Sequence, residues 1–148
     1  MDENIDEMRL AIVREAKEWL GTPWHHEARV KGSGVDCGMF ILEIGERVGA
    51  IPHVDPPHYS MDFMLHNEKE WYLETVLQYC VELEGPPYLP GDIILFRHGR
   101  TYSHGAIVID YPKIIHASFP DRCVCWEDVS ILPWQAKKKK FLRYKGAV

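Results

Sequence analysis

The sequence predicts an α+β protein in which N-terminal helices pack on a mainly antiparallel sheet of five or six strands. Two observations support this prediction. Apolar residues recur at helical spacing in the first half of the 148-residue chain, whereas short runs of branched residues between turns fill the second half. Helices followed by hairpin-linked strands are typical of this fold class. A chain of this length supports one packed core, so we expect residues 1–148 to form a single domain.

The first half predicts three helices. Apolar positions repeat at helical spacing over residues 5–20, and Gly21-Thr22-Pro23 ends that run. A glycine-containing loop follows, and Asp36 after it is a natural N-cap for a second helix. A third helix is expected over about residues 67–82. Cys37 therefore lies in the first turn of the second helix.

The second half predicts a sheet with a hairpin at its centre. The expected strands cover residues 93–97, 104–109, 113–117, 123–127 and 141–144. Asp110-Tyr111-Pro112 forms the turn between the second and third of them. His104 begins one strand of this hairpin and His116 lies near the end of the other. Antiparallel pairing brings the two imidazoles together.

Cys37, His104 and His116 are the candidate catalytic residues. A thiol attacks an amide as a thiolate, so a catalytic cysteine needs a positive environment and a base for its proton. A helix start supplies unpaired N–H groups and the positive end of the helix dipole, and Gly38 leaves room for a substrate. We expect His104 to be the base and His116 to orient it. Alternatively, Cys37 is a small buried core residue, as most free cysteines are.

Composition and charge exclude several other classes of function. The formal net charge is −5 and the charges are scattered, which gives no basic face for nucleic acid. The first ten residues are acidic and lack an apolar core, so we expect no signal peptide and no membrane insertion. The four cysteines show no CxxC spacing, which favours a reduced compartment such as the cytoplasm. The sequence predicts no oligomeric state.

Four segments together resemble the NlpC-type cell-wall peptidases, a papain-like family. They are Gly21-Thr22-Pro23-Trp24, Asp36-Cys37, Pro90-Gly91-Asp92-Ile93-Ile94-Leu95-Phe96, and the pair Ser103-His104-Gly105-Ala106-Ile107-Val108 with Ile114-Ile115-His116-Ala117. Their order and spacing agree with the family over most of the chain. Residues 22–37 look particularly like the branch found in bacteriophages and gene transfer agents, so location in a phage particle is an alternative to the cytoplasm.

The resemblance implies a function. It implies a papain-like fold and a cysteine peptidase that cleaves the bond between γ-D-glutamate and a diamino acid in peptidoglycan stem peptides. It implies catalysis by Cys37, His104 and His116, with no metal and no cofactor. Trp24 stands where the family commonly has a tyrosine whose hydroxyl helps the oxyanion hole, and Gly38-Met39 replaces a Ser-Gly pair. We therefore expect Trp24, Asp36 and Gly38 to line the oxyanion and substrate pocket.

Several alternatives stay open at this point. The same Cys–His machinery suits an acyltransferase or an amidase, and a decayed site would suit a structural or assembly protein of a phage particle. Arg29 and Lys31 are candidates for binding substrate carboxylates, although ordinary solvated charges are the alternative. Two further groups hint at a metal site but have no usual zinc spacing, so we expect local packing there. They are His25 with His26, and Cys123 with Cys125.

Overall fold

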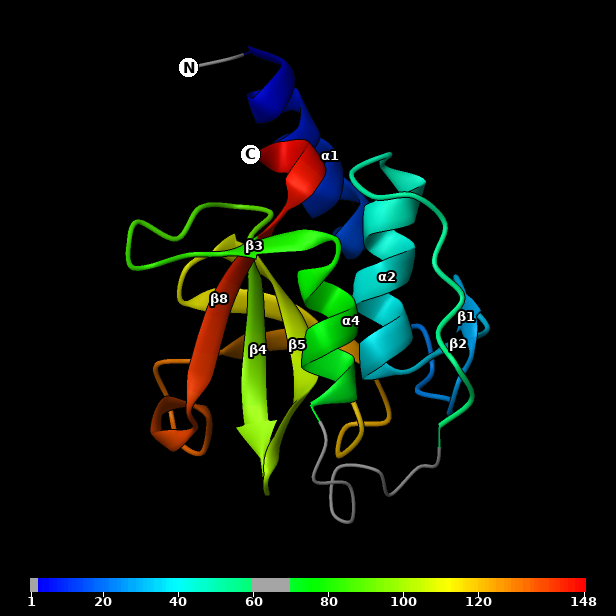
Figure 1. Ribbon diagram of the computed structural model, residues 1–148. Coiled ribbons are helices and arrows are strands. Elements are labelled where there is room, and N and C mark those ends of the chain that lie inside the picture. Colours follow the sequence, from blue (N-terminus) through cyan, green and yellow to red (C-terminus); the bar gives the residue numbers. More distant parts are fainter. Residues whose placement is uncertain (1–2, 60–69) are drawn as a thin grey trace.

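A computed structural model describes residues 3–59 and 70–148, and within them three α-helices pack against a six-stranded antiparallel sheet (Figure 1). The helices are α1 (Glu3–Glu18), α2 (Cys37–Arg47) and α4 (Trp71–Leu77). In spatial order the sheet contains β3 (Cys80–Glu82), β8 (Lys139–Tyr144), β4 (Ile93–His98), β5 (Thr101–Asp110), β6 (Lys113–Ser118) and β7 (Cys123–Asp128). A small second sheet pairs β1 (Arg29–Val30) with β2 (Gly34–Val35). The predicted fold class is confirmed.

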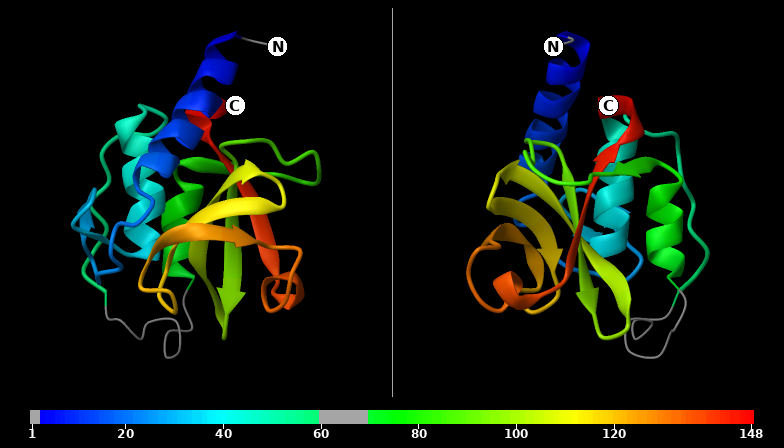
Figure 2. Two further views of the ribbon diagram at one scale, coloured as in Figure 1. Left: turned by 180° about the vertical axis from the view of Figure 1, so that it is seen from behind. Right: turned by 60° about the vertical axis from the view of Figure 1, so that its left-hand side comes forward.

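The main core lies between α2 and the centre of the sheet. Phe40, Ile41 and Ile44 are at most 1% exposed and form the apolar face of α2 that the sequence predicts. This face packs against β5 and β6, and the two further views keep α2 and α4 on one side of the sheet (Figure 2). Packing on the sheet therefore fixes the helix whose first residue is Cys37.

The opposite face of the sheet carries a second, smaller cluster. Alternate residues of β4 and β5 point there, among them Phe96, Ala106 and Val108, all fully buried. Trp134, in the 3-10 helix η1 (Trp134–Ala136), packs against this cluster. Because the central strands are covered on both faces, Ile93-Ile94-Leu95-Phe96 is a continuous apolar run rather than an alternating one.

The third predicted helix ends earlier than expected, so the prediction for residues 78–82 is wrong. The helix stops at Leu77, and Cys80–Glu82 forms β3, which pairs with β8 so that Cys80 lies opposite Tyr144. Pairing with the final strand satisfies backbone groups that a continued helix would bond internally, and this outweighs the local helical periodicity. The start of the expected helix, residues 67–69, lies outside the described residues.

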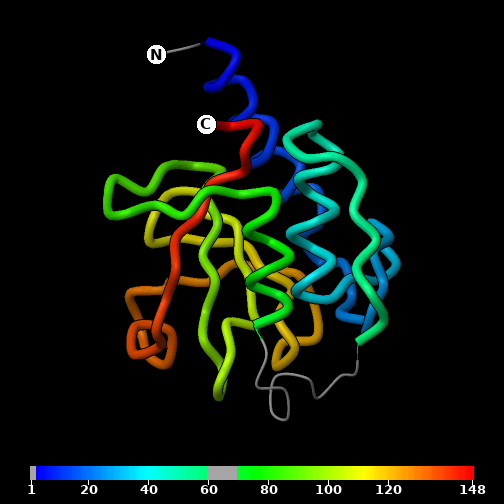
Figure 3. The backbone as a smooth tube through the Cα atoms, viewed as in Figure 1, coloured from blue at the N-terminus to red at the C-terminus, as the bar shows by residue number. Residues whose placement is uncertain are grey.

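A buried ion-pair network joins the two ends of the chain to the sheet. Asp92 is fully buried and accepts from Arg9 of α1 at 3.0 Å and from Arg143 of β8 at 2.7 and 2.8 Å. Arg9 also donates to the carbonyl of Ala147, in the C-terminal 3-10 helix η2 (Lys145–Ala147). The backbone trace shows α1 and the C-terminal segment side by side (Figure 3). In the described part of the chain, no helix has the length and apolarity needed to cross a membrane.

Candidate active site

The loop that delivers Cys37 is attached to the edge of the large sheet. Backbone hydrogen bonds of 2.9 Å join Gly21 N–H to the carbonyl of Val124, in β7, and Val124 N–H to the Thr22 carbonyl. Val35 N–H donates to the Pro23 carbonyl at 3.0 Å, which links the same segment to β2. The start of α2, two residues further on, is thereby fixed against the sheet.

Asp36 caps α2 as the sequence predicts. Its carboxylate accepts from Met39 N–H at 2.9 Å, from Glu27 N–H at 2.7 Å and from the hydroxyl of Tyr59. The residue is only 2% exposed. All of these donors belong to the chain itself, so Asp36 positions Cys37 and stabilises the helix start.

The Cys37 thiol lies at the end of the sheet where β5 begins. Its sulfur donates to the Ser103 carbonyl at 3.6 Å, directly before His104, and no described imidazole hydrogen bonds to it. Burial, followed by the nearby Asp36 charge, raises the thiol pKa well above its usual range. Backbone N–H groups of Cys37, Gly38 and Gly105 oppose that rise without overcoming it. The thiol is therefore protonated when no substrate is bound.

The β5–β6 hairpin brings His104 and His116 together as predicted. Their facing nitrogens, Nε2 of His104 and Nδ1 of His116, lie 2.8 Å apart, and the side chains are buried. Desolvation lowers the pKa of both imidazoles, that of His116 to about 4, and the neighbouring His116 lowers that of His104 further. Both rings are neutral at neutral pH, and one nitrogen of the pair must carry the shared proton.

A β-bulge sets the position of His104 relative to the thiol. His104 lies opposite Phe96, whereas Arg97 already pairs with Tyr102, so Ser103 is the extra residue. The bulge turns the Ser103 carbonyl toward Cys37. Nδ1 of His104 has no hydrogen bond among the described residues and is not one of the buried, unpartnered polar atoms. This nitrogen is therefore the one available to a thiol or a substrate.

Two aromatic residues that the sequence did not single out surround the site. Trp134 covers the histidine pair, with its ring centroid 5.6 Å from that of His104 and 5.1 Å from that of His116. Tyr72 of α4 is 3% exposed, and its buried hydroxyl has no hydrogen-bond partner among residues 3–59 and 70–148. The Tyr72 hydroxyl lies 2.8 Å from the position that a Cβ on Gly105 would occupy, and the Cys37 charge contributes to the raised pKa of Tyr72. No local sequence pattern marks either residue.

The remaining predicted pocket residues differ in what surrounds them. Gly38 faces the ring of Tyr72, which would lie 3.3 Å from a Cβ at that position. Trp24 packs edge-on against Phe119 at 4.9 Å, and its buried indole N–H has no partner within the part of the chain that the structure describes. Gly38 therefore lets the Tyr72 ring approach the helix start closely, whereas the Trp24 N–H is enclosed by protein.

The structure does not bring Arg29 and Lys31 into the site. Arg29 donates to Glu43 at 2.8 Å and to Glu46 at 2.9 Å, both on α2, and also to the Val54 carbonyl. Lys31 pairs with Glu15 and Glu18 of α1. Carboxylates of the chain itself occupy both cations, so we do not include them in the proposed substrate site.

The sequence matches no protein-family model and no curated protein. Its structure resembles solved structures of NlpC/P60 proteins. NlpC1 from Trichomonas vaginalis is 20% identical with a TM-score of 0.63, and the match covers 94% of this chain and 44% of that one. The NlpC/p60 domain of the peptidoglycan hydrolase SagA is 21% identical (TM-score 0.57; coverage 89% and 96%). The peptidoglycan hydrolase RipB from Mycobacterium tuberculosis is 15% identical (TM-score 0.65; coverage 98% and 68%). The chain thus has the papain-like NlpC/P60 fold, and it spans less than half of NlpC1.

Proposed function

We propose that this chain is a cysteine peptidase that cleaves peptidoglycan stem peptides between γ-D-glutamate and a diamino acid. The observation that carries the proposal is the His104–His116 pair, joined at 2.8 Å, next to a helix-start cysteine whose sulfur contacts the residue before His104. The NlpC/P60 fold, shared with two peptidoglycan hydrolases, supports a cell-wall substrate. The specific bond follows from the resemblance of the sequence motifs.

The reaction begins with a proton transfer. The resting thiol and both imidazoles are neutral, so the proton must move during the attack. The Cys37 thiol rotates away from the Ser103 carbonyl and gives its proton to Nδ1 of His104 as the sulfur attacks the amide carbon. His116 accepts the Nε2–H of His104 through its own Nδ1, which keeps the Nδ1 lone pair of His104 facing the thiol. Hydrogen bonds with the thiol are often loose before a substrate binds.

The tetrahedral intermediate then breaks down. The carbon–nitrogen bond breaks, His104 returns its proton to the leaving amine, and a thioester on Cys37 remains. Water, deprotonated by His104, hydrolyses the thioester and restores the thiol. Backbone N–H groups at the start of α2 are placed to stabilise the oxyanion, because they are not all used within the helix.

Tyr72 supports the same step from α4. Its unpartnered hydroxyl lies within electrostatic reach of Cys37, so it is a donor for the negative charge that develops on the sulfur. This provides one charge-stabilising donor in a site where the Trp24 N–H is enclosed. In our proposal, Tyr72 is therefore a thiolate-stabilising residue.

Digestion of muropeptides followed by mass spectrometry tests the proposal. The wild-type protein should split L-Ala-γ-D-Glu-diamino acid peptides after γ-D-Glu, and a metal chelator should leave this activity intact. Cys37→Ala should abolish the cleavage with little change in thermal stability. Cys80→Ala is the matched control, because it removes a buried thiol on the edge strand β3, which β8 and β4 separate from the histidine strands, and it should keep activity. Cleavage by Cys37→Ala would contradict the mechanism.

One observation favours a second candidate, a catalytically decayed protein that only binds wall peptide or a neighbouring protein. The raised pKa of Cys37 and its bond to a carbonyl describe an unreactive thiol at rest. If the wild-type protein binds stem peptide but releases no fragment under any pH, this candidate replaces the peptidase. Transfer of the acyl group to an added amine, without hydrolysis, would instead indicate an acyltransferase.

A further inference from the structure

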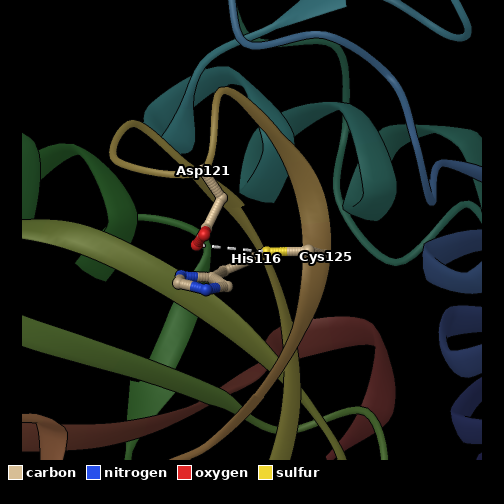
Figure 4. A group of neighbouring side chains, drawn as sticks. All are labelled: His116, Asp121 and Cys125. Atoms are coloured by element: carbon tan, nitrogen blue, oxygen red, sulfur yellow. Dashed lines mark hydrogen bonds between the residues drawn. The ribbon is translucent and has the colours of Figure 1, made fainter.

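A group of metal-ligand atoms includes His116, the partner of His104. The group consists of His116, Asp121 and Cys125, whose ligand atoms all lie within 4.8 Å of one another (Figure 4). The β6–β7 register places Cys125 directly opposite His116, and Asp121 lies in the connection between the two strands. Sulfur of Cys125 and Oδ2 of Asp121 are 3.6 Å apart.

One nitrogen of the His116 ring is left for a ligand. His116 is completely buried, its Nδ1 faces His104, and no described residue forms a hydrogen bond with its Nε2. The carboxylate of Glu127 lies 3.9 Å from this nitrogen, which is too far for a hydrogen bond. A buried polar atom without a partner is costly, so its persistence here indicates a place for a ligand.

We propose that His116, Asp121 and Cys125 bind a divalent transition-metal ion of the zinc type. An imidazole nitrogen, a thiolate and one carboxylate suit zinc or cobalt, whereas calcium and magnesium need more oxygen ligands. Binding releases the thiol proton of Cys125 to solvent. Three protein ligands leave a fourth position for water or for Glu127, which lies nearby.

The geometry requires only a small adjustment. Bonds of about 2.1 Å in a tetrahedron place ligand atoms about 3.4 Å apart, so a group spread over 4.8 Å must contract slightly. His116 is rigid, whereas Cys125 is partly exposed and Asp121 is exposed, so the latter two can move inward. Asp121 is already oriented by the hydroxyl of Ser118 at 2.7 Å, a typical contact of a metal-binding carboxylate.

Metal binding would also control the proposed catalytic pair, and this part rests on the proposed function. A metal on Nε2 of His116 leaves the ring proton on Nδ1, which then donates to Nε2 of His104. His104 must in turn carry its own proton on Nδ1. It can no longer accept the proton of Cys37, so metal binding switches the base off. The metal is thus a reversible inhibitor rather than a cofactor.

Titration with Co²⁺ tests the site without any need for activity. The Cys37→Ala variant is used as the background, because it removes the active-site thiol as a competing ligand. It should bind cobalt with a sulfur-to-metal charge-transfer band, and Zn²⁺ should displace that band. Adding Cys125→Ser should abolish the band, and Asp121→Asn should weaken binding on the order of 10–100-fold. Cys123→Ser, on the same strand, is the matched control and should bind normally.

The outcomes separate the two proposals. Absence of the band in the Cys37→Ala background, or its persistence with Cys125→Ser, overturns the metal site whatever the activity. In proteins that retain Cys37, Zn²⁺ should inhibit muropeptide cleavage by the wild type. Cys125→Ser should need at least a tenfold higher Zn²⁺ concentration for the same inhibition. Equal inhibition of both overturns the inhibitory role. A normal cobalt spectrum in a protein that never cleaves peptide supports the metal site and contradicts only the proposed peptidase.

Discussion

Replacement of Tyr72 by phenylalanine should stabilise the protein and impair its chemistry at the same time. The Tyr72 hydroxyl is buried and has no hydrogen-bond partner in the described part of the chain, and the residue is only 3% exposed. A buried hydroxyl that makes no hydrogen bond costs about 1 kcal/mol or more relative to a hydrogen atom. Tyr72→Phe should therefore raise the free energy of unfolding by about 1 kcal/mol.

The effect on activity should have the opposite sign. A hydrogen bond to a charged group contributes about 1.5–3 kcal/mol, so losing the donor to the Cys37 thiolate should lower kcat/KM about 10- to 100-fold. The same loss should raise the pKa of the Cys37 thiol further. The alkaline pH at which iodoacetamide modifies Cys37 should shift upward accordingly.

Tyr144 is the matched control for this experiment. It is also fully buried, but its hydroxyl donates to the Ile41 carbonyl at 2.5 Å. Tyr144→Phe should lower the free energy of unfolding by about 1 kcal/mol and leave kcat/KM unchanged. Urea unfolding and initial-rate measurements on both variants give all four values. If Tyr72→Phe lost stability and kept full activity, the hydroxyl would have a partner in solution and no part in catalysis.

Three further predictions concern the pocket, the histidine pair and the ion-pair network. Trp24→Tyr should fold and raise turnover about tenfold if the new hydroxyl supplies an oxyanion donor, and steady-state kinetics measure this. Burial lowers the pKa of His116 from 6.5 to about 4, so the unfolded protein binds more protons than the folded protein between pH 4 and pH 6.5. The free energy of unfolding should fall by about 3 kcal/mol, from this residue alone, as the pH falls from 6.5 toward 4. In urea unfolding of chelator-treated protein, His116→Asn should show a smaller loss over this pH range than the wild type. Asp92→Asn should lower the free energy of unfolding, measured in urea, by about 3 kcal/mol. Glu82→Gln, which breaks an exposed pair with Lys140, should lower it by less than about 1 kcal/mol. Equal losses for the two variants would contradict a buried role for Asp92.

Local patterns predicted the elements that place the site. Asp36 before an apolar helical run predicted the N-cap of α2, and the structure shows its bond to Met39 N–H. The turn at Asp110-Tyr111-Pro112 predicted the hairpin that joins His104 to His116. Both features depend on interactions between residues close in sequence or across one tight turn, so a single sequence is enough to reveal them.

Features that depend on distant contacts were not predicted. Cys80–Glu82 follows a helical pattern but becomes a strand because β8, nearly 60 residues later, pairs with it. Tyr72 and Trp134 reach the site only after α4 and η1 dock on the sheet. The bulge at Ser103 is likewise visible only in the register of β4 and β5. In each case the deciding interaction joins segments that no local pattern relates.

The electrostatics of the thiol show why position alone did not predict its resting state. The helix start favours a thiolate, but desolvation and the charge of Asp36, the residue that caps the helix, both favour the thiol. The surroundings of His104 also oppose its protonation, because burial, His116 and His98 all lower its pKa. An ion pair between the two residues is therefore unfavourable until the thiolate charge passes onto a substrate carbonyl. In the proposed mechanism, the reactivity of Cys37 therefore depends on a bound substrate, which protects the thiol from unrelated electrophiles.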